Sequence, residues 1–375
     1  MTGVQRQAVT LTGLDTALAL LLADLAPVAP IELDVADALG SVAAAMPPLA
    51  SALPAHSIAM VDGWALRAVD LTGASSYTPV PLPLAPAWVE AGDPLPPGCD
   101  CVLDASAVEQ AGPLAQAVVD ALPGAGVRRL GEDLPAGADA LVAGRRIGVV
   151  DEMIARRAGR AEVRVRRPRV RIIDVPAAGG NATTIGLVAA QLRGAGAQLD
   201  RTVAAGRDVA SVGKAIAGAD CDLLITVGGT GAGRNDAAVT ALATHATLIH
   251  GLALQPGRTA AVGRIGAMPV VAVPGAPDQA LAVWWMLVLP VLDRLSGRTL
   301  RRAAVKPLVR KIASTVGMTD LVLLQDTPDG WLPLAIGDLP LRALAAADAW
   351  LAVPAASEGF ATGAPVGGYP LREGL

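Results

Sequence analysis

A glycine-rich turn in the middle of the chain is the first place where the residue types suggest chemistry. The apolar run LLITV at residues 223–227 predicts a buried strand, and a helix is expected to begin near Asp236. Between them lie small residues, namely Gly228, Gly229, Thr230, Gly231 and Gly233. Ligands of open α/β sheets bind beyond the carboxyl ends of strands, where glycine lets backbone N–H groups approach an anion. We therefore predict a phosphate-bearing ligand. The turn is not a P-loop, because no Gly-Lys-Ser/Thr follows it. The alternative for Asp236 is a purely structural role as the N-cap of the helix.

Two further turns could form other walls of the same site. One places a single cation on a tight turn and comprises Gln255, Pro256, Gly257 and Arg258. The other joins a strand to a helix and comprises Pro274, Gly275 and Pro277, with the last proline near the helix start. Either turn could be a plain connection. The functional interpretation is that their backbone groups line the ligand while the Arg258 guanidinium binds phosphate.

Acidic residues, rather than histidines, are the candidates for catalysis. Asp62 lies beside a glycine in an apolar run, where an acid is unusual, and it could equally be a turn residue. Asp133 lies with Arg128 in the charged loop VRRLGEDLPAG. The three histidines lack metal-ligand spacing, and the sequence contains neither GxSxG nor HExxH. Acids with a hard cation are therefore the expected catalytic groups.

Composition narrows the class of protein. Among 375 residues, Asp and Glu outnumber Lys and Arg by 34 to 30, which argues against a nucleic-acid partner. An apolar fraction of 53% excludes a disordered chain, and three cysteines cannot form a disulfide framework. The most apolar segment, residues 280–292, has 13 residues, whereas a membrane span needs about 20. With no signal-peptide pattern at the start, we expect a cytoplasmic protein without a membrane partner.

The elements that must position these residues change in type along the chain. Between residues 169 and 297, apolar runs alternate with helical segments, which predicts a parallel α/β sheet covered on both faces. Residues 45–144 are rich in proline and predict a β-rich module, preceded by a helix at 14–25 and followed by one at 149–159. Short apolar pieces after residue 300 predict a small β module.

A basic segment, VRVRRPRVRIIDV at residues 163–175, leads into the α/β region. Its alternation of arginines, with an internal proline, is interpreted as a solvated linker entering a new domain. A nucleic-acid patch is the alternative, and it is disfavoured because no aromatic residues lie between the arginines.

Taken in order, these segments resemble the MoeA family of molybdopterin molybdenumtransferases, which is related to the E domain of gephyrin. AMVDGWALRAVD resembles the family's SAMDGYA-type segment, GDPLPPGCDCVL its TGAPVPxGxDAVV-type segment, and VRRLGEDLPAG its R-x-x-GED-x-x-G segment. GGTGAGRNDAAV resembles the SGGxSxGxxD loop, and also the related MogA adenylyltransferases. LALQPGRTAAVG resembles the KPGKP segment, VVAVPGAPDQALAVW the GLPGNP-x-S segment, and LPVLDRLSG the helix that follows.

The resemblance implies a multidomain protein of the α/β plus β class. It implies a central MogA-like parallel α/β domain, a Pro-rich β module inserted near the N-terminus, and a small C-terminal β-barrel domain. The expected boundaries are 1–47 with 141–168 for an N-terminal helical and linker domain, 48–140 for the Pro-rich module, 169–299 for the molybdopterin-binding α/β domain, and 300–375 for the C-terminal domain. Family members form elongated homodimers, and their active cleft lies between the α/β domain of one subunit and the β-rich module of its partner.

The resemblance also implies a function in molybdenum cofactor biosynthesis. Molybdate is inserted into adenylylated molybdopterin, and AMP is released in a step that depends on Mg²⁺. The matching motifs make Asp62, Asp133 and Asp236 the expected catalytic residues, with Asp62 and Asp236 as Mg²⁺ ligands. The three turns described above and Arg128 are expected to bind substrate. Expected partners are a second copy of the chain, a MogA-type adenylyltransferase and a recipient molybdoenzyme.

Several positions depart from the family pattern. Gln255 and Arg258 replace the two lysines of KPGKP, Ala91 replaces the threonine of TGAP, and Ala276 replaces the asparagine of PGNP. Val61 is an extra residue before Asp62, and the family's TGDE loop reads PAAGGNATT here, without an acid. The pterin-binding frame is therefore retained while several polar groups are absent. One interpretation is a working transferase with an altered site, and the other is a non-catalytic molybdopterin-binding paralogue that acts as a carrier or partner subunit. An unrelated phosphosugar or nucleotide enzyme on the same frame is a third.

Overall fold

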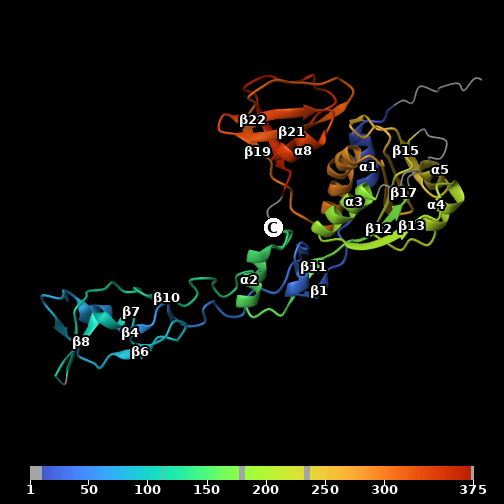
Figure 1. Cartoon of the computed structure of the whole chain (residues 1–375). Helices are drawn as coiled ribbons and strands as arrows, with labels where there is room; N and C mark the ends of the chain where they lie inside the picture. Colours follow the sequence, from blue (N-terminus) through green and yellow to red (C-terminus); the bar gives the residue numbers. More distant parts are fainter. Residues whose placement is uncertain (1–10, 113, 177–181, 232–236, 373–375) are drawn as a thin grey trace, which may run out of the picture. The chain divides into compact units, whose positions relative to one another are not determined.

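The computed structural model describes residues 11–112, 114–176, 182–231 and 237–372 (Figure 1). The chain divides into two units. The smaller unit comprises Met46–Leu141 and Ile154–Arg160, and the larger unit comprises the remainder. Among the described residues, no helix is both long enough and apolar enough to cross a membrane.

A six-stranded mixed sheet forms the centre of the larger unit. Its strand order is β13-β12-β14-β18-β17-β15. The strands are β12 (Arg169–Asp174), β13 (Gln198–Val203), β14 (Leu223–Val227), β15 (Thr247–His250), β17 (Ala261–Ile265) and β18 (Met268–Val273). The first four in this order run parallel, as predicted, but β17 and β15 pair antiparallel. The prediction of a wholly parallel sheet is wrong there, because a turn at Gly266 joins β17 directly to β18 and leaves no room for a crossover helix.

Helices cover both faces of this sheet. The alternation of side chains along each strand sends Ile172 to one face and Ile173 to the other. One face packs against α1 (Leu14–Leu22), α3 (Thr183–Gly194), α6 (Pro277–Val283) and α7 (Leu289–Ser296). The other packs against α4 (Val209–Ile216) and α5 (Ala238–Ala243) (Figure 1). The sheet is thus the middle of three layers.

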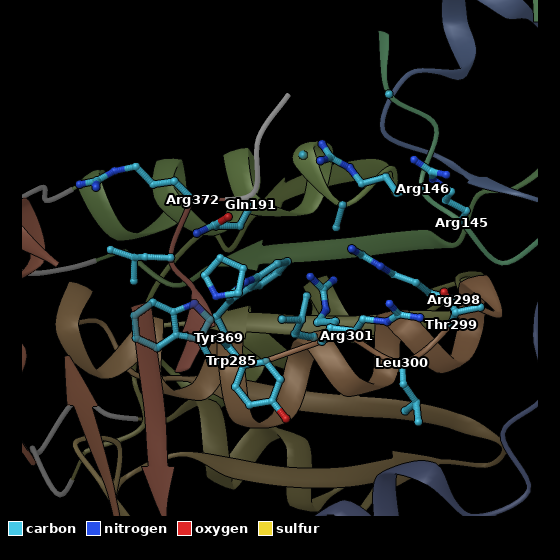
Figure 2. A pocket seen from close by; sticks show the side chains of 18 of the residues that line it. Arg145, Arg146, Gln191, Trp285, Arg298, Thr299, Leu300, Arg301, Tyr369 and Arg372 are labelled. Carbon is cyan, nitrogen blue, oxygen red and sulfur yellow. The ribbon is translucent and has the colours of Figure 1, made fainter. Parts of the chain in front are cut away.

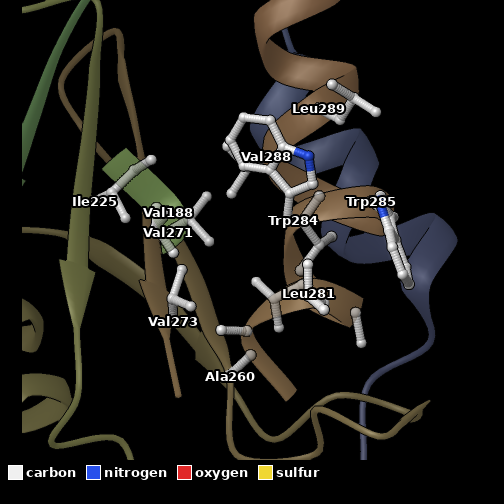
Figure 3. Close-up of a cluster of buried hydrophobic side chains, with 14 of the residues drawn as sticks. Val188, Ile225, Ala260, Val271, Val273, Leu281, Trp284, Trp285, Val288 and Leu289 are labelled. Carbon is white, nitrogen blue, oxygen red and sulfur yellow. The ribbon is translucent and has the colours of Figure 1, made fainter. Parts of the chain in front are cut away.

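The helical segment from α6 to α7 contains a π-helical turn, η4 (Trp284–Val288). Pro290 is the second residue after this turn and has no N–H to donate to the carbonyl four residues earlier, so the regular α-helical bonding is interrupted there. Figure 3 shows the result for two neighbouring indoles. Trp284 lies on the side of the helix that faces Ile225 and Val271, whereas Trp285 lies on the opposite side.

A three-stranded sheet is formed by β1 (Ile31–Asp34), β11 (Glu162–Arg166) and β2 (Val42–Ala43), with β11 in the centre. Val163 and Val165 of β11 are fully buried. The interpretation of this segment as a solvated linker is therefore wrong, because its valines alternate with its arginines and fill one face of a sheet. The turn η1 (Val35–Ala38) follows β1, and helix α2 (Val149–Arg157) precedes β11.

The C-terminal region forms a sheet in the order β16-β21-β23-β25-β19, and β22 pairs with β21. Its members are β16 (Leu254–Gln255), β19 (Ala304–Pro307), β21 (Thr319–Thr327), β22 (Gly330–Ile336), β23 (Ala349–Val353) and β25 (Pro365–Pro370). A separate pair, β20 (Ile312–Ala313) with β24 (Gly359–Phe360), and helix α8 (Leu341–Ala346) complete the region. Strand β16 comes from the α/β part of the chain, so this sheet contains residues from both regions.

Aromatic rings also connect these two regions. Trp285 stacks on Trp350 of β23 with ring centroids 5.3 Å apart, and Trp350 stacks on Tyr369 of β25 at 5.0 Å. A single hydrophobic core contains both Ile225 of β14 and Leu323 of β21. The α/β region and the C-terminal region are therefore packed together through shared apolar side chains.

The smaller unit is built from short strands and 3₁₀ turns. They are β3 (Ile58–Ala59), β4 (Gly63–Leu66), β5 (Val80–Pro81), β6 (Ala87–Val89), β7 (Cys101–Leu103), β8 (Val108–Ala111), β9 (Leu114–Ala117), β10 (Val127–Arg128), η2 (Ala68–Leu71) and η3 (Ala105–Ala107). Strand β4 lies between β6 and β7, and β9 lies between β5 and β8. Leu71 and Cys101 are fully buried in the core between these sheets.

Candidate functional site

The turn after β14 takes its shape from two glycines. All five residues of β14 are buried, and Gly228 and Gly229 follow with φ angles of +91° and +70°, in the left-handed region that favours glycine. The Gly228 N–H donates a hydrogen bond to the carbonyl oxygen of Val273 on the neighbouring strand, at 2.9 Å. Thr230 is buried behind the turn, and Gly231 is half-buried. Gly233 and Asp236, which the sequence analysis assigned to this site, lie outside the described residues, as do residues 177–181 of the PAAGGNATT segment.

The turn after β18 lies beside the turn after β14. Pro274 is buried, Gly275 is exposed, and Pro277 is the first residue of α6. A Cβ atom built on Gly275 would lie 3.6 Å from the Cα atom of Gly228. The hydroxyl of Thr184, in the first turn of α3, donates to the carbonyl oxygen of Gly275 at 2.6 Å. The segments that follow β12, β14 and β18 therefore meet at the carboxyl edge of the parallel strands.

The Gln-Pro-Gly-Arg turn is connected to this edge through Thr259. The Thr259 hydroxyl lies 3.3 Å from the Thr230 hydroxyl and 3.5 Å from Oε1 of Gln279, a residue of α6. His250 Nε2 lies 3.1 Å from the Thr230 carbonyl oxygen. Thr184, Thr259 and Gln279 are not among the residues that the sequence predicts for this site, because nothing in their local sequence distinguishes them from ordinary polar residues.

Arg258 is the exposed cation of the same turn. Its guanidinium forms no hydrogen bond or ion pair with any residue in the described part of the chain. Its backbone is fixed, since its carbonyl oxygen accepts from the Leu252 N–H at 3.0 Å. Gly257, with a φ of +127°, lies against Leu254, and Pro256 is buried. Arg258 is thus a charged side chain on a rigid backbone.

Gln255 lies next to an acid. As a residue of β16 it is the register partner of Asp320 in β21. Asp320 is buried and accepts a hydrogen bond from the Ser314 hydroxyl at 2.7 Å. A neutral amide at position 255 can donate and accept hydrogen bonds here, but it adds no charge.

In the smaller unit, the expected acids already have protein partners. Asp62 is exposed and accepts a hydrogen bond from the N–H of Ala91 at 2.7 Å. Asp133 and Arg128 form an ion pair of 2.7 Å, and both side chains are about one third exposed. Arg128 of β10 is the register partner of Ile58 in β3. Asp62 follows the end of β3 by three residues, so the ion pair and Asp62 are attached to the same small sheet.

These residues do not form a magnesium site within the described part of the chain. No group of three or more His, Cys, Asp or Glu side chains gathers among the described residues. Asp62 belongs to the smaller unit and bonds to the backbone of Ala91, while Asp236 is not described. The expected Mg²⁺ stays a prediction.

Comparison with known proteins adds a family to this geometry. Residues 12–159 match the family described as "MoeA N-terminal region (domain I and II)", and residues 180–294 match the "Probable molybdopterin binding domain". The molybdopterin molybdenumtransferase 2 of Mycobacterium tuberculosis H37Rv is 30% identical over 284 residues, which are 65% of this chain and 70% of the relative. Molybdopterin molybdenumtransferase 1 of the same strain is 25% identical over 395 residues, which are 89% of this chain and 93% of the relative.

Solved structures show the same fold. The molybdopterin biosynthesis MoeA protein from Pyrococcus horikoshii OT3 superposes with a TM-score of 0.72 at 21% identity, and the comparison covers 96% of this chain and 100% of that one. A second structure of a MoeA protein from that species gives a TM-score of 0.69 at 24% identity, over 97% and 100% of the two chains. The fold is thus a multidomain MoeA-like α/β fold. With two matching family segments and a 30% identical relative of which it covers 70%, the chain belongs to the MoeA family.

Proposed function

We propose that this protein is a molybdopterin molybdenumtransferase that acts in molybdenum cofactor biosynthesis in the cytoplasm. Family membership supports the proposal, and one structural observation carries it to particular residues. The turn at Gly228, the turn at Gly275 and the turn bearing Arg258 meet at the carboxyl edge of the parallel strands. Such an edge presents backbone N–H groups to an anion, and Arg258 adds a cation with no partner among the described residues.

The residues of this edge divide the proposed work between them. The backbone around Gly228 and Gly275 holds molybdopterin and its phosphate, because glycine allows a ligand to approach the main chain closely. Arg258 binds an oxyanion, either the phosphate or molybdate, through two parallel N–H groups. Gln255 orients the same ligand by hydrogen bonding without neutralising it. The hydroxyls of Thr230 and Thr259 keep the two turns in register.

The finer proposal follows the family reaction. Molybdopterin arrives in its adenylylated form, one water molecule is consumed at the phosphoanhydride, and AMP leaves as molybdate is inserted. Asp62, Asp133 and Arg128 of the smaller unit are proposed to act on the same substrate. A homodimer, a MogA-type adenylyltransferase that supplies the substrate and a recipient molybdoenzyme belong to this proposal. No step is derived through Mg²⁺, since the described residues do not form a site for it.

Complementation tests the proposal. The gene is expressed in a bacterial strain that lacks its own molybdenumtransferase, and molybdoenzyme activity is measured at low molybdate. We expect activity to return, and we expect Arg258→Gln to lower the rate of insertion by about 10²–10³, the usual cost of losing a charged group that contacts a developing anion. The rate of Arg258→Lys should lie between those of the unaltered chain and Arg258→Gln, because lysine keeps the positive charge but lacks the two parallel N–H groups of the guanidinium.

Lys214→Gln is the matched control, since Lys214 is an exposed cation on α4, away from the three turns. It should behave as the unaltered chain. A folded, well-expressed protein that binds molybdopterin but restores no activity would refute the transferase and indicate a carrier. An Arg258→Gln variant with full activity would refute the assigned role of Arg258 while leaving the transferase in place.

A further inference from the structure

A pocket of the larger unit lies outside the proposed site. It has a volume of about 1280 Å³ and is lined by residues from the segment before α2, the end of α3, the π-helical turn, residues 298–302, and β23 and β25 with the residues after it (Figure 2). None of the residues assigned to the molybdopterin site lines it. It lies at the opposite end of α3 from Thr184, since Gln191, Gly194 and Ala195 belong to its wall.

The charge of this pocket differs from that of the chain as a whole. The chain has a net charge of −4, yet one aspartate, Asp151, lines the pocket against six arginines. These are Arg145, Arg146, Arg298, Arg301, Arg302 and Arg372. Like charges gathered in a concave surface raise the local potential and attract an anion. Figure 2 shows Arg145, Arg146 and Arg298 toward one end of the pocket, Arg301 near its middle and Arg372 toward the other end.

Protein groups neutralise only part of this charge. Arg301 is paired, because its guanidinium forms two hydrogen bonds of 2.8 and 2.9 Å with the Asp293 carboxylate. Arg145 lies 3.9 Å from Asp151 and is largely exposed, so that contact is weak. Arg302 is exposed and forms no hydrogen bond or ion pair with any described residue.

The charge of Arg372 is also not neutralised by any described residue, because its guanidinium donates only to neutral carbonyl oxygens. It donates to carbonyl oxygens at the end of α8, including that of Ala347 at 3.1 Å. The guanidinium charges of Arg302 and Arg372 are therefore left without a carboxylate partner among the described residues, and that of Arg145 has only its 3.9 Å contact with Asp151.

The walls of the pocket are fixed before any ligand enters. The Thr299 N–H and hydroxyl both donate to the carbonyl oxygen of Gly144, at 2.9 and 3.2 Å, which holds the Arg145 segment beside residues 298–302. The stacked rings of Trp285, Trp350 and Tyr369 form an aromatic wall. The backbone of these segments and the aromatic wall therefore need no ordering when a ligand binds, which favours affinity.

We propose that this pocket binds a small ligand that carries two or more linked phosphate groups. Guanidinium groups match phosphate oxygens in pairs, and the arginines come from separate segments, so a single phosphate would leave several of them unused. The volume is large enough for such a ligand. A nucleotide and an inorganic polyphosphate share this chemistry.

The test is titration calorimetry on the full chain with inorganic tripolyphosphate, pyrophosphate and ADP at fixed ionic strength. The pocket variant is Arg145→Gln with Arg302→Gln, and the control is Lys311→Gln with Arg342→Gln, which removes the same charge at exposed positions outside the pocket. We expect tripolyphosphate to bind, and the pocket variant to weaken binding by about 100-fold, or tenfold for each charged hydrogen-bonding group. The control should change it little.

Comparison of ADP with pyrophosphate distinguishes a nucleotide from an inorganic polyphosphate, because both ligands carry two phosphates and only ADP carries a nucleoside. Tighter binding of ADP would show that the aromatic wall contacts a nucleoside, and equal binding would show that the phosphates suffice.

The proposal is overturned if no anion binds, if both double variants weaken binding equally, or if Arg258→Gln abolishes the binding that the pocket variant retains. A changed sedimentation coefficient of the pocket variant without loss of anion binding would overturn it too, and would make the pocket a contact between copies. If the double variant fails to fold, Arg302→Gln alone, at an exposed side chain, carries the same test with a roughly tenfold effect.

Discussion

Thr259 shows how much of the proposed site depends on a single hydroxyl. Its oxygen lies within 3.5 Å of the Thr230 hydroxyl and of Gln279, so one side chain contacts the turn after β14 and the first helix after β18. Thr259 also follows Arg258 directly in the sequence. The position of the Arg258 cation relative to the glycine turns is therefore set by a neighbouring polar contact rather than by the arginine itself.

Cys101 supplies a prediction about pH. Its side chain is fully buried and its thiol lies 3.4 Å from the Leu66 carbonyl oxygen. Burial, and then the negative charge of Asp100, raise the pKa of this thiol from 9.0 to about 11. The unfolded chain therefore loses this proton at a lower pH than the folded chain. The stabilising contribution is complete below pH 9 and is lost as the pH rises from 9 to 11, by about 3 kcal/mol in all.

Urea unfolding at pH 8 and pH 10 measures this effect. The free energy of unfolding should fall between the two pH values by more in the unaltered chain than in Cys101→Ala, which lacks the titrating group. An equal fall in both proteins would show that the Cys101 thiol does not carry the dependence.

Residues of the candidate site differ in how far the sequence could reveal them. Gly228, Gly229 and Pro277 could be located because a left-handed turn and a helix start impose residue types that are visible locally. Thr184 and Thr259 could not, because a threonine hydroxyl is informative only when its partner is known, and each partner here lies far away in the sequence. Asp62 shows the converse, since an unusual acid was visible but its bond to the Ala91 N–H was not.

Strand patterns show a similar limit at the level of elements. The sequence predicts a parallel sheet where β17 and β18 form an antiparallel hairpin, because periodicity identifies a strand but not its direction. The arginines of β11 suggest a solvent-exposed linker, although the valines that alternate with them are buried on one face of a sheet. In both cases the local sequence does not reveal the partner strand. For β11 that partner lies far away in the sequence, and for β17 it follows directly after a short turn.

The sheet of β4 and β7 supplies a prediction about a glycine. A Cβ atom at Gly63 would overlap the Leu103 carbonyl oxygen, a backbone atom of the paired strand that cannot move aside alone. Gly63→Ala should therefore destabilise the smaller unit by about 3 kcal/mol, at the upper end of the usual cost of overpacking. The measurement is the free energy of unfolding in urea.

Gly186→Ala is the control for this substitution. Gly186 lies in α3 with no atom within 4 Å of its built Cβ, so alanine should stabilise the helix by about 0.5–1 kcal/mol. A Gly63→Ala protein as stable as the unaltered chain would mean that the two strands lie further apart than this geometry gives.

At the scale of the whole molecule, the division into two units predicts two unfolding transitions. Leu71 is fully buried in the core of the smaller unit, and Leu323 is fully buried in the core that joins the α/β and C-terminal regions. Truncating each to alanine should cost about 2–5 kcal/mol of its own unit's stability. Differential scanning calorimetry should show that Leu71→Ala lowers one transition and Leu323→Ala the other. One shared transition, shifted by both variants, would contradict independent units.

Strand β16 has a consequence for how this protein could be divided or recombined. Leu254 and Gln255 belong in sequence to the α/β region but pair with Thr319 and Asp320 of the C-terminal sheet. The turn that carries Arg258 therefore follows a strand whose pairing partners lie more than sixty residues later in the sequence, since Leu254 pairs with Thr319. A chain shortened at residue 300 would lack β21 and would leave β16 unpaired. A C-terminal region taken from a relative would present a different β21 for β16 to pair with. The C-terminal sheet and the turn that carries Arg258 are thus one structural unit, and neither can be exchanged without the other.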